Sequence, residues 1–196
     1  MSFAMETTED VGGSASDQYL NEPGTYHCVI TSVAENEGPK GNPIDGFTVG
    51  LSVLDGTAKG QKDKSMNLCL FSPDQSKTEK SQEWARKKQT AFAIASGLID
   101  LKKLGGKVQI NLQDAAGRQV VLSLEHDDAG KYLQLSYANI YHVDDPRAAN
   151  FPKDKEALAI IAKDLRKDAA YFMPLTKRGE SAKTASRLSN SDLADL

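Results

Sequence analysis

Two pairs of adjacent aspartates are the best candidates in this sequence for metal-dependent chemistry. Asp127 with Asp128, and Asp144 with Asp145, supply carboxylate oxygens of the kind that hold divalent cations in nucleases. Such a site needs several oxygen ligands from different segments, whereas the first pair lies in a predicted hairpin turn and the second lies at a predicted strand end. Because aspartate is favoured in turns for backbone reasons, we predict no metal site.

Histidine and cysteine form no enzyme motif. His27, His126 and His142 lie far apart, and none has a partner at the spacing of a metal or nucleophile motif. Cys28 and Cys69 lie in alternating apolar segments, which favours buried free thiols over a cross-strand disulfide or a reactive thiol. The glycine-rich stretch GPKGNPIDG, residues 38–46, does not match the phosphate-binding pattern Gly-x-x-x-x-Gly-Lys-Ser/Thr. We therefore predict that the protein is not an enzyme and uses no cofactor.

Positive charge is concentrated in the middle of the chain. The 196 residues carry a formal net charge of -3, but residues 59–118 carry +6 and the remainder carries -9. The overall acidity argues against a wholly basic nucleic-acid binder, yet folding could gather these cations on one face. Affinity for phosphates grows with each counterion that such cations release.

Aromatic residues accompany these cations. Bases of a single strand stack on exposed rings at about 1 to 3 kcal/mol each, whatever their sequence. Alternation predicts an exposed Tyr132 beside Lys131 and an exposed Phe71 at a strand end, whereas Trp84 is expected in the core with Phe92. The predicted nucleic-acid-binding residues are Lys59, Lys62, Lys64, Phe71, Arg86, Lys87, Lys88, Lys107, Arg118, Lys131 and Tyr132. Solvated surface is the alternative interpretation, above all for the lysines of the helix.

Six strands and two helices are expected to position these residues. Alternating patterns predict strands over residues 25–34, 47–56, 65–71, 107–113, 118–126 and 131–143. Residues 35–46, 114–117 and 127–130 have the composition of loops, the last two of hairpin type. A helix begins with a capping box of Ser76 and Glu79 and ends at Gly97, and a second helix covers residues 153–172.

This order of elements predicts a mainly β protein. Strand hairpins with a helix between strands 3 and 4 favour a small antiparallel barrel of the oligonucleotide-binding (OB) type, with a C-terminal helix added. We expect a flexible arm over residues 1–20, the barrel over 21–150, the helix over 151–174 and a flexible tail over 175–196. The N-terminus lacks a signal peptide and no apolar run reaches the roughly 20 residues of a membrane span, so we predict a cytoplasmic protein without a membrane partner.

Three stretches resemble a known family. They are LNEPGTYHCVITSVAENEGPKGNPIDGFTVGLSVLDGTAKGQ, AFAIASGLIDLKKLGGKVQINL and YLQLSYANIYHVDDPRA, within roughly residues 20–150. The matching pieces are Pro-Gly-x-Tyr, Asp-Gly with the following Lys-Gly, Ala-x-Gly and Leu-Gly-Gly-Lys. The chain resembles a phage-encoded family catalogued without function, some members of which resemble OB-fold single-stranded-DNA-binding proteins. The resemblance implies sequence-independent coating of single strands in phage replication or recombination, in the host cytoplasm.

Two functions stay open at this point. In the first, the barrel binds single-stranded DNA, with Lys59, Lys62 and Lys64 facing phosphates in a turn that Gly56 and Gly60 permit. The resemblance adds replication or recombination proteins as partners of the weakly acidic tail, and a homo-oligomer is open as well. In the alternative, the barrel is a protein-interaction module that binds a replication, nuclease or host defence factor and has no affinity for nucleic acid.

Overall fold

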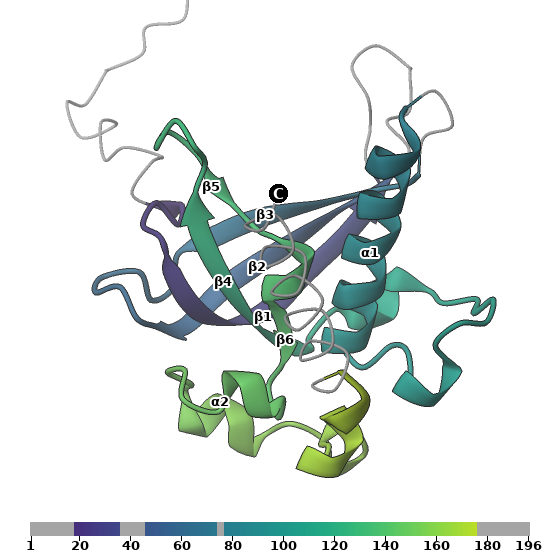
Figure 1. Ribbon diagram of the computed structural model, residues 1–196. Coiled ribbons are helices and arrows are strands. Elements are labelled where there is room, and N and C mark those ends of the chain that lie inside the picture. Colours follow the sequence, from purple (N-terminus) through teal and green to yellow (C-terminus); the bar gives the residue numbers. More distant parts are fainter. Residues whose placement is uncertain (1–17, 36–45, 74–76, 176–196) are drawn as a thin grey trace, which may run out of the picture.

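The computed structural model describes residues 18–35, 46–73 and 77–175. A single antiparallel sheet curls into a half-barrel, with α1 standing on its concave side and the C-terminal segment covering part of its outer face (Figure 1). The strands are β1 (Gly24–Glu35), β2 (Gly46–Gly56), β3 (Ser65–Phe71), β4 (Gln119–His126), β5 (Leu133–Gln134) and β6 (Ile140–His142). They follow the order β3-β2-β1-β4-β5, and β6 also pairs with β4.

Alternation of apolar residues explains the sheet and its curl. In β1 and β2 every second residue turns inward, and these side chains are buried. The pairing of β1 with β2 shifts register between His27 and Cys28 and again between Ile30 and Ser32, and such bulges increase strand twist and bend. The predicted fold class is confirmed, because the protein is mainly β and OB-like, with a helix after the third strand.

Helix α1 (Glu79–Ala95) fills the concave side of the sheet. Phe92 and Ala95 are buried in the same core as the inward faces of β1, β2, β3 and β4. The N-cap of α1 is Thr78, whose hydroxyl accepts a hydrogen bond from the backbone N–H of Ser81. The predicted capping residue Ser76 lies outside the described residues. Gly97 follows the helix with a φ of +70°, which agrees with the predicted helix end.

The predicted strand over 107–113 is wrong. Its alternation is visible in burial, since Leu112 is buried while Gln109 and Asn111 are exposed, but residues 107–111 join no ladder. On the side of β1 away from β2, Ile30 already bonds to the backbone of Gly117 and Arg118. That edge is therefore occupied, and residues Leu112–Ala115 form a 3₁₀ helix instead of entering the sheet.

The predicted strand over 131–143 is interrupted in its middle. Residues Tyr137–Asn139 form a 3₁₀ helix between β5 and β6, and the Ser136 hydroxyl accepts a hydrogen bond from the Ala138 N–H at its start. Serine competes with a sheet ladder through such local bonds, which the alternation pattern did not reveal.

The long helix predicted over 153–172 is also wrong, although a C-terminal helix is present. It is α2 (Lys155–Ala159), followed by the 3₁₀ helices Lys163–Leu165 and Ala169–Phe172. The carbonyls that a continuous helix would use accept other donors. The Ala157 carbonyl accepts from Gln119, and the Leu165 carbonyl bonds to His142. Contacts with the sheet therefore replace helical hydrogen bonds in this segment.

Part of the expected flexible N-terminal arm is ordered against the sheet. Tyr19 and Leu20, within the expected flexible arm, lie along the start of β3, where the Leu20 N–H donates to the Ser65 carbonyl at 2.9 Å. Residues 36–45 of the loop predicted over 35–46, the rest of the arm and the tail beyond residue 175 lie outside the described residues, whereas Glu35 and Gly46 belong to β1 and β2. Among the helices that the structure describes, none has the length and apolar character needed to cross a membrane.

Candidate nucleic-acid interface

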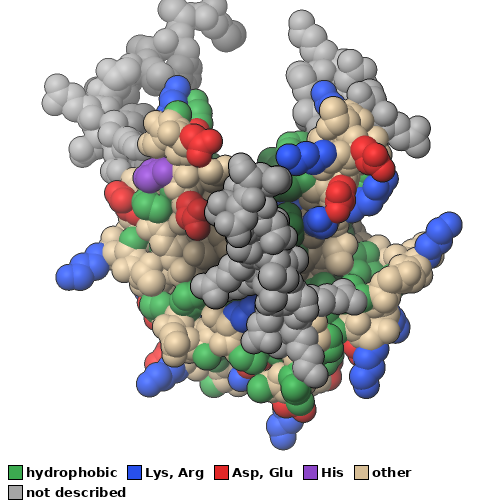
Figure 2. All heavy atoms as spheres, viewed as in Figure 1, with side chains coloured by type: hydrophobic (Ala, Val, Ile, Leu, Met, Phe, Trp, Pro, Cys, Tyr) green, Lys and Arg blue, Asp and Glu red, His purple; other side chains and the backbone are tan. Residues whose placement is uncertain are grey.

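The surface is hollowed between α1 and the β4–β5 hairpin. In Figure 2 the two elements stand on opposite sides of this hollow, and Lys, Arg, Asp and Glu side chains are interspersed on the α1 side. Residues 86–88 supply three of these cations in consecutive positions of the helix. Arg86 and Lys87 line a cavity beside Tyr137, whereas Lys88 lies over Trp84 on another side of the helix, and Lys131 and Tyr132 lie on the hairpin.

Trp84 and Lys88 form the first aromatic and cationic pair of the α1 wall. The Lys88 Nζ lies 4.9 Å from the centroid of the Trp84 ring, and 42% of Trp84 is exposed. The expectation that Trp84 belongs to the core is wrong, because the neighbouring Ala85 takes the inward position. Partial burial lowers the pKa of the Lys88 ammonium below its ordinary value.

Phe71 is exposed, as predicted. The residue ends β3, 44% of it is exposed, and its carbonyl accepts a hydrogen bond of 2.9 Å from the Gln89 side chain of α1. The end of β3 is thus fixed to the helix wall. Phe71 and Trp84 are both available to contact a ligand that follows this edge of the molecule.

Lys87 and Tyr137 form the second pair. The Lys87 Nζ lies 5.6 Å from the Tyr137 ring centroid and 2.6 Å from a carboxylate oxygen of Glu83. Arg86 donates to the Gln82 side chain at 3.2 Å and is exposed. Tyr137 was not among the predicted site residues, because alternation placed it on the apolar face of a strand that the structure interrupts.

Lys131 and Tyr132 form the third pair, on the hairpin. The Lys131 Nζ lies 5.0 Å from the Tyr132 ring centroid, and 62% of Tyr132 is exposed, as predicted. The Asp127 carboxylate accepts hydrogen bonds from the backbone N–H groups of both residues, at 2.7 and 3.0 Å. These bonds lower the pKa of Asp127 and hold the turn that presents the pair. Asp127 therefore has a structural role in the turn.

The lysine loop before β3 lies away from the α1 wall. Lys59 is exposed, Lys62 forms an ion pair of 3.3 Å with Asp154, and Lys64 donates to the Asn21 side chain at 3.2 Å. Residues Ser65–Phe71 separate this loop from α1 by about 20 Å, at roughly 3.3 Å per residue. The structure does not join the loop and the helix into one basic patch.

Two other predicted residues do not join the hollow. Arg118 is half-buried, and its guanidinium donates to the Ser96 carbonyl at 2.8 Å, just beyond the end of α1. This contact stabilises the helix end and occupies the side chain. Lys107 is exposed on the extended segment that follows the 3₁₀ helix Leu101–Lys103.

The second pair of candidate aspartates has structural partners. Asp144 forms an ion pair of 2.7 Å with Arg166, and Asp145 one of 2.7 Å with Arg147. Within the residues that the structure describes, no three His, Cys, Asp or Glu side chains are grouped to hold a metal ion.

Both cysteines are free thiols. Cys28 is buried, and desolvation raises its pKa to about 12, which makes it a poor nucleophile. Cys69 is only half-buried, so the expectation of burial holds for Cys28 alone.

Comparison with known families gives one match. The model of a family described as "Protein of unknown function (DUF669)" matches residues 9–150, which include every strand and α1. No curated protein matches the chain.

Proposed function

The chain belongs to the DUF669 family, and we propose that it binds single-stranded DNA without sequence preference in the hollow between α1 and the β4–β5 hairpin. The observation that supports this function is a repeated pairing of an aromatic ring with a lysine ammonium. It occurs at Trp84 with Lys88, Tyr137 with Lys87, and Tyr132 with Lys131. The first pair lies on α1, the second joins Lys87 of α1 to Tyr137 of the facing 3₁₀ helix, and the third lies on the hairpin.

Each pair offers a nucleotide two complementary contacts. The ring provides a flat apolar face on which any base can stack, and the ammonium can contact the phosphate beside that base. Lys88 adds a further argument, because its ammonium is already partly desolvated and lacks a carboxylate partner among the described residues. An anion at this position would compensate that loss of hydration.

The biological setting is part of the same proposal. The sequence resemblance to phage-encoded proteins supports coating of single strands during replication or recombination in the host cytoplasm. The three pairs offer a strand stacking and charge, and neither contact selects one base over another.

Fluorescence anisotropy with a labelled poly-dT oligonucleotide tests the function. We expect binding that weakens steeply as salt is raised and that duplex of equal length does not displace. Trp84→Ala or Tyr132→Ala should weaken binding about tenfold each, since one stacked base contributes about 1 to 3 kcal/mol. Lys102→Ala, which removes an exposed lysine of another segment, is the matched control and should bind as the parent does. Absence of poly-dT binding at low salt would exclude the function.

A protein-interaction module is the second candidate. Ile160, at the end of α2, is 82% exposed, which is unusual for a large aliphatic side chain and fits a surface that a protein partner covers. This function predicts no salt-dependent affinity for oligonucleotides. It also predicts a stable protein complex that Ile160→Asp disrupts, whereas Lys163→Ala on the neighbouring 3₁₀ helix leaves it intact.

A further inference from the structure

A groove of about 660 Å³ runs along one face of α1, beside the Lys87–Tyr137 pair. Its α1 wall is formed by Glu83, Arg86, Lys87, Thr90, Ala91, Ile94 and Ala95. These positions recur at the spacing of a single helix face and extend over about 18 Å, at about 1.5 Å per residue. The opposite wall is the segment that contains Tyr137, β6 and Arg147. The volume is that of a small-molecule site, typically about 300 to 1,000 Å³.

The groove has an apolar floor and a basic mouth. Ala91, Ile94 and Ile140 form the floor, while Arg86 and Lys87 stand on one side of the mouth and Arg147 on the other. The small side chains Ala91 and Ala138 leave the space into which a flat group can enter.

The carboxylates that line this groove are already paired. Glu83 lies 2.6 Å from the Lys87 ammonium, and Asp145, which is 2% exposed, lies 2.7 Å from the Arg147 guanidinium. Arg86 has only the neutral Gln82 side chain as a partner among the described residues. The mouth therefore keeps an excess of positive charge and complements an anion.

We propose that this groove is a base pocket, in which one unpaired nucleotide of the bound strand inserts its base between α1 and Tyr137. The flanking phosphates then lie near Arg86 on one side and Arg147 on the other. This inference rests on the proposed function and gives it a defined subsite. A nucleotide suits the site because it joins a flat apolar ring to an anion, which are the two features that the floor and the mouth complement.

The buried polar side chains of the pocket are used internally, so they cannot select one base. His142 lines the groove, but its Nδ1 accepts from the Asp144 N–H at 3.1 Å and its Nε2 bonds to the Leu165 carbonyl at 3.0 Å. Among the described residues, no buried side-chain nitrogen or oxygen lacks a hydrogen-bond partner. The groove thus has no buried side-chain group left to read a base edge.

A groove-filling variant tests the pocket. Ala138 lines the groove from an exposed position in a 3₁₀ helix, so Ala138→Trp should fill the groove without disturbing the core. We expect it to weaken poly-dT binding about tenfold, the effect of one lost stacked base, whereas Ala138→Ser keeps the groove open and should bind as the parent does. Circular dichroism melting of both variants would show that the fold is retained.

Methyl NMR separates the pocket from the rest of the interface. Addition of dTMP should shift the methyl signals of Ala91 and Ile94 in the parent and in Tyr132→Ala, but not in Ala138→Trp. Poly-dT should displace dTMP from the groove.

Each alternative result has a distinct meaning. If the parent binds poly-dT, but Ala138→Trp binds equally well and the methyl signals stay unchanged, the pocket is overturned while the proposed function stands. If dTMP shifts these signals and poly-dT does not displace it, the groove binds free nucleotides and the strand pocket is again overturned. If the parent binds no poly-dT at all, the proposed function itself fails.

Discussion

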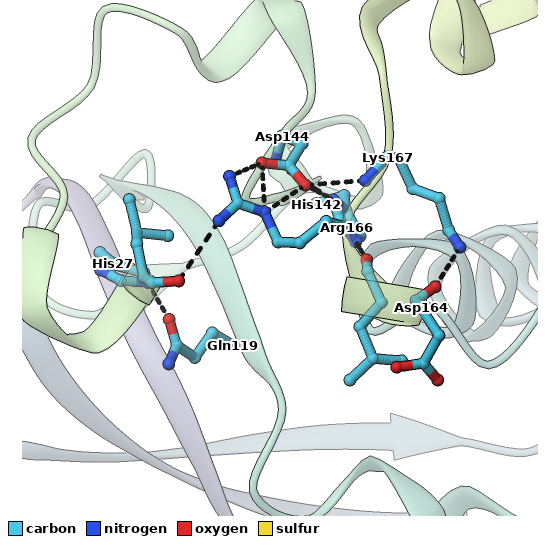
Figure 3. Close-up of polar contacts among 9 residues, drawn as sticks. His27, Gln119, His142, Asp144, Asp164, Arg166 and Lys167 are labelled. Atoms are coloured by element: carbon cyan, nitrogen blue, oxygen red, sulfur yellow. Dashed lines mark hydrogen bonds and ion pairs between the residues drawn. The ribbon is translucent and has the colours of Figure 1, made fainter. Parts of the chain in front are cut away.

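Asp154 donates its backbone N–H to Nδ1 of His27 at 3.1 Å, so a buried imidazole fastens the C-terminal segment to β1. His27 Nε2 must then carry the proton, which it shares with the Gln119 side-chain oxygen at 2.9 Å. Gln119 in turn donates to the Ala157 carbonyl at 2.7 Å. This chain of three contacts joins two strands to the start of α2, and Figure 3 shows part of it.

His142 of β6 forms a similar contact with a later part of the C-terminal segment. Its Nδ1 accepts from the Asp144 N–H and its Nε2 donates to the Leu165 carbonyl, which again requires the neutral ring with the proton on Nε2. Arg166 completes this fastening through an ion pair with Asp144 (Figure 3). Burial opposes ionisation of Asp144, but the Arg166 and Lys167 donors outweigh it and lower the pKa of that carboxyl.

The first prediction is a loss of stability in weak acid. Burial lowers the pKa of both His27 and His142, so between the unfolded value of about 6.5 and the folded value the unfolded chain binds more protons than the folded one. The free energy of unfolding should therefore be highest above about pH 6.5, fall as the pH drops below it, and level off below the folded pKa values. Urea denaturation at several pH values measures this.

Replacing His27 shows how much of this pH dependence of stability comes from that residue. His27→Gln should flatten part of the pH dependence, whereas His126→Gln, which changes an exposed histidine, should leave it unaltered. Equal stability of the parent at about pH 7.5 and about pH 5 would contradict the prediction.

The second prediction concerns Gln119. Gln119→Leu removes the acceptor of His27 and the donor to the Ala157 carbonyl, leaving one buried and one half-buried polar group without those partners. We expect a loss of about 2 to 4 kcal/mol in the free energy of unfolding, and faster proteolysis within residues 151–172. The control is Gln113→Leu, an exposed glutamine for which no change in stability is expected. A variant as stable as the parent would show that the contacts do not fasten the segment.

Local pattern and tertiary contacts explain which elements could be predicted. The strands β1, β2, β3 and β4 follow from alternation, since every second residue along each of them lies in the same core. The segment at 107–113 has the same alternation, but β1 offers it no free edge. The spacing within a segment does not reveal which edge is vacant.

The residues of the candidate site could likewise be predicted only where the local pattern was not overridden by packing. Tyr132 could be predicted as exposed, because its hairpin is short and its alternation is clear. Trp84 could not, because two adjacent residues of a helix compete for the inward direction and only packing shows that Ala85 occupies it. Arg147 and Tyr137 enter the groove through 3₁₀ helices that follow strand-like patterns, so no periodic signal marked them.

The third prediction concerns Gly56, where β2 ends. A Cβ built on Gly56 would overlap a ring carbon of Tyr26, which is fully buried and cannot move aside. Gly56→Ala should therefore lower the free energy of unfolding by about 1 to 3 kcal/mol, the usual cost of overpacking. The same change at Gly106, whose nearest atom is 3.7 Å away, should be neutral or slightly stabilising. Equal melting temperatures for the two variants would contradict the clash.

The fourth prediction compares the two groups of cations by the salt dependence of binding. For single strands, the slope of log affinity against log salt falls by about 0.7 for each phosphate contact removed. Replacing residues 86–88 by alanine together removes the cations of the α1 wall, and should reduce the slope by about one to two.

Replacing Lys59, Lys62 and Lys64 together is the matched experiment, because it also removes three lysines. Since Lys62 and Lys64 already contact Asp154 and Asn21, and the loop lies about 20 Å from α1, this variant should change the slope less. The slope reports how many phosphates each group of cations neutralises. If the loop variant reduced the slope more than the helix variant did, the phosphates of the bound strand would lie at the loop near Gly60 and not in the hollow.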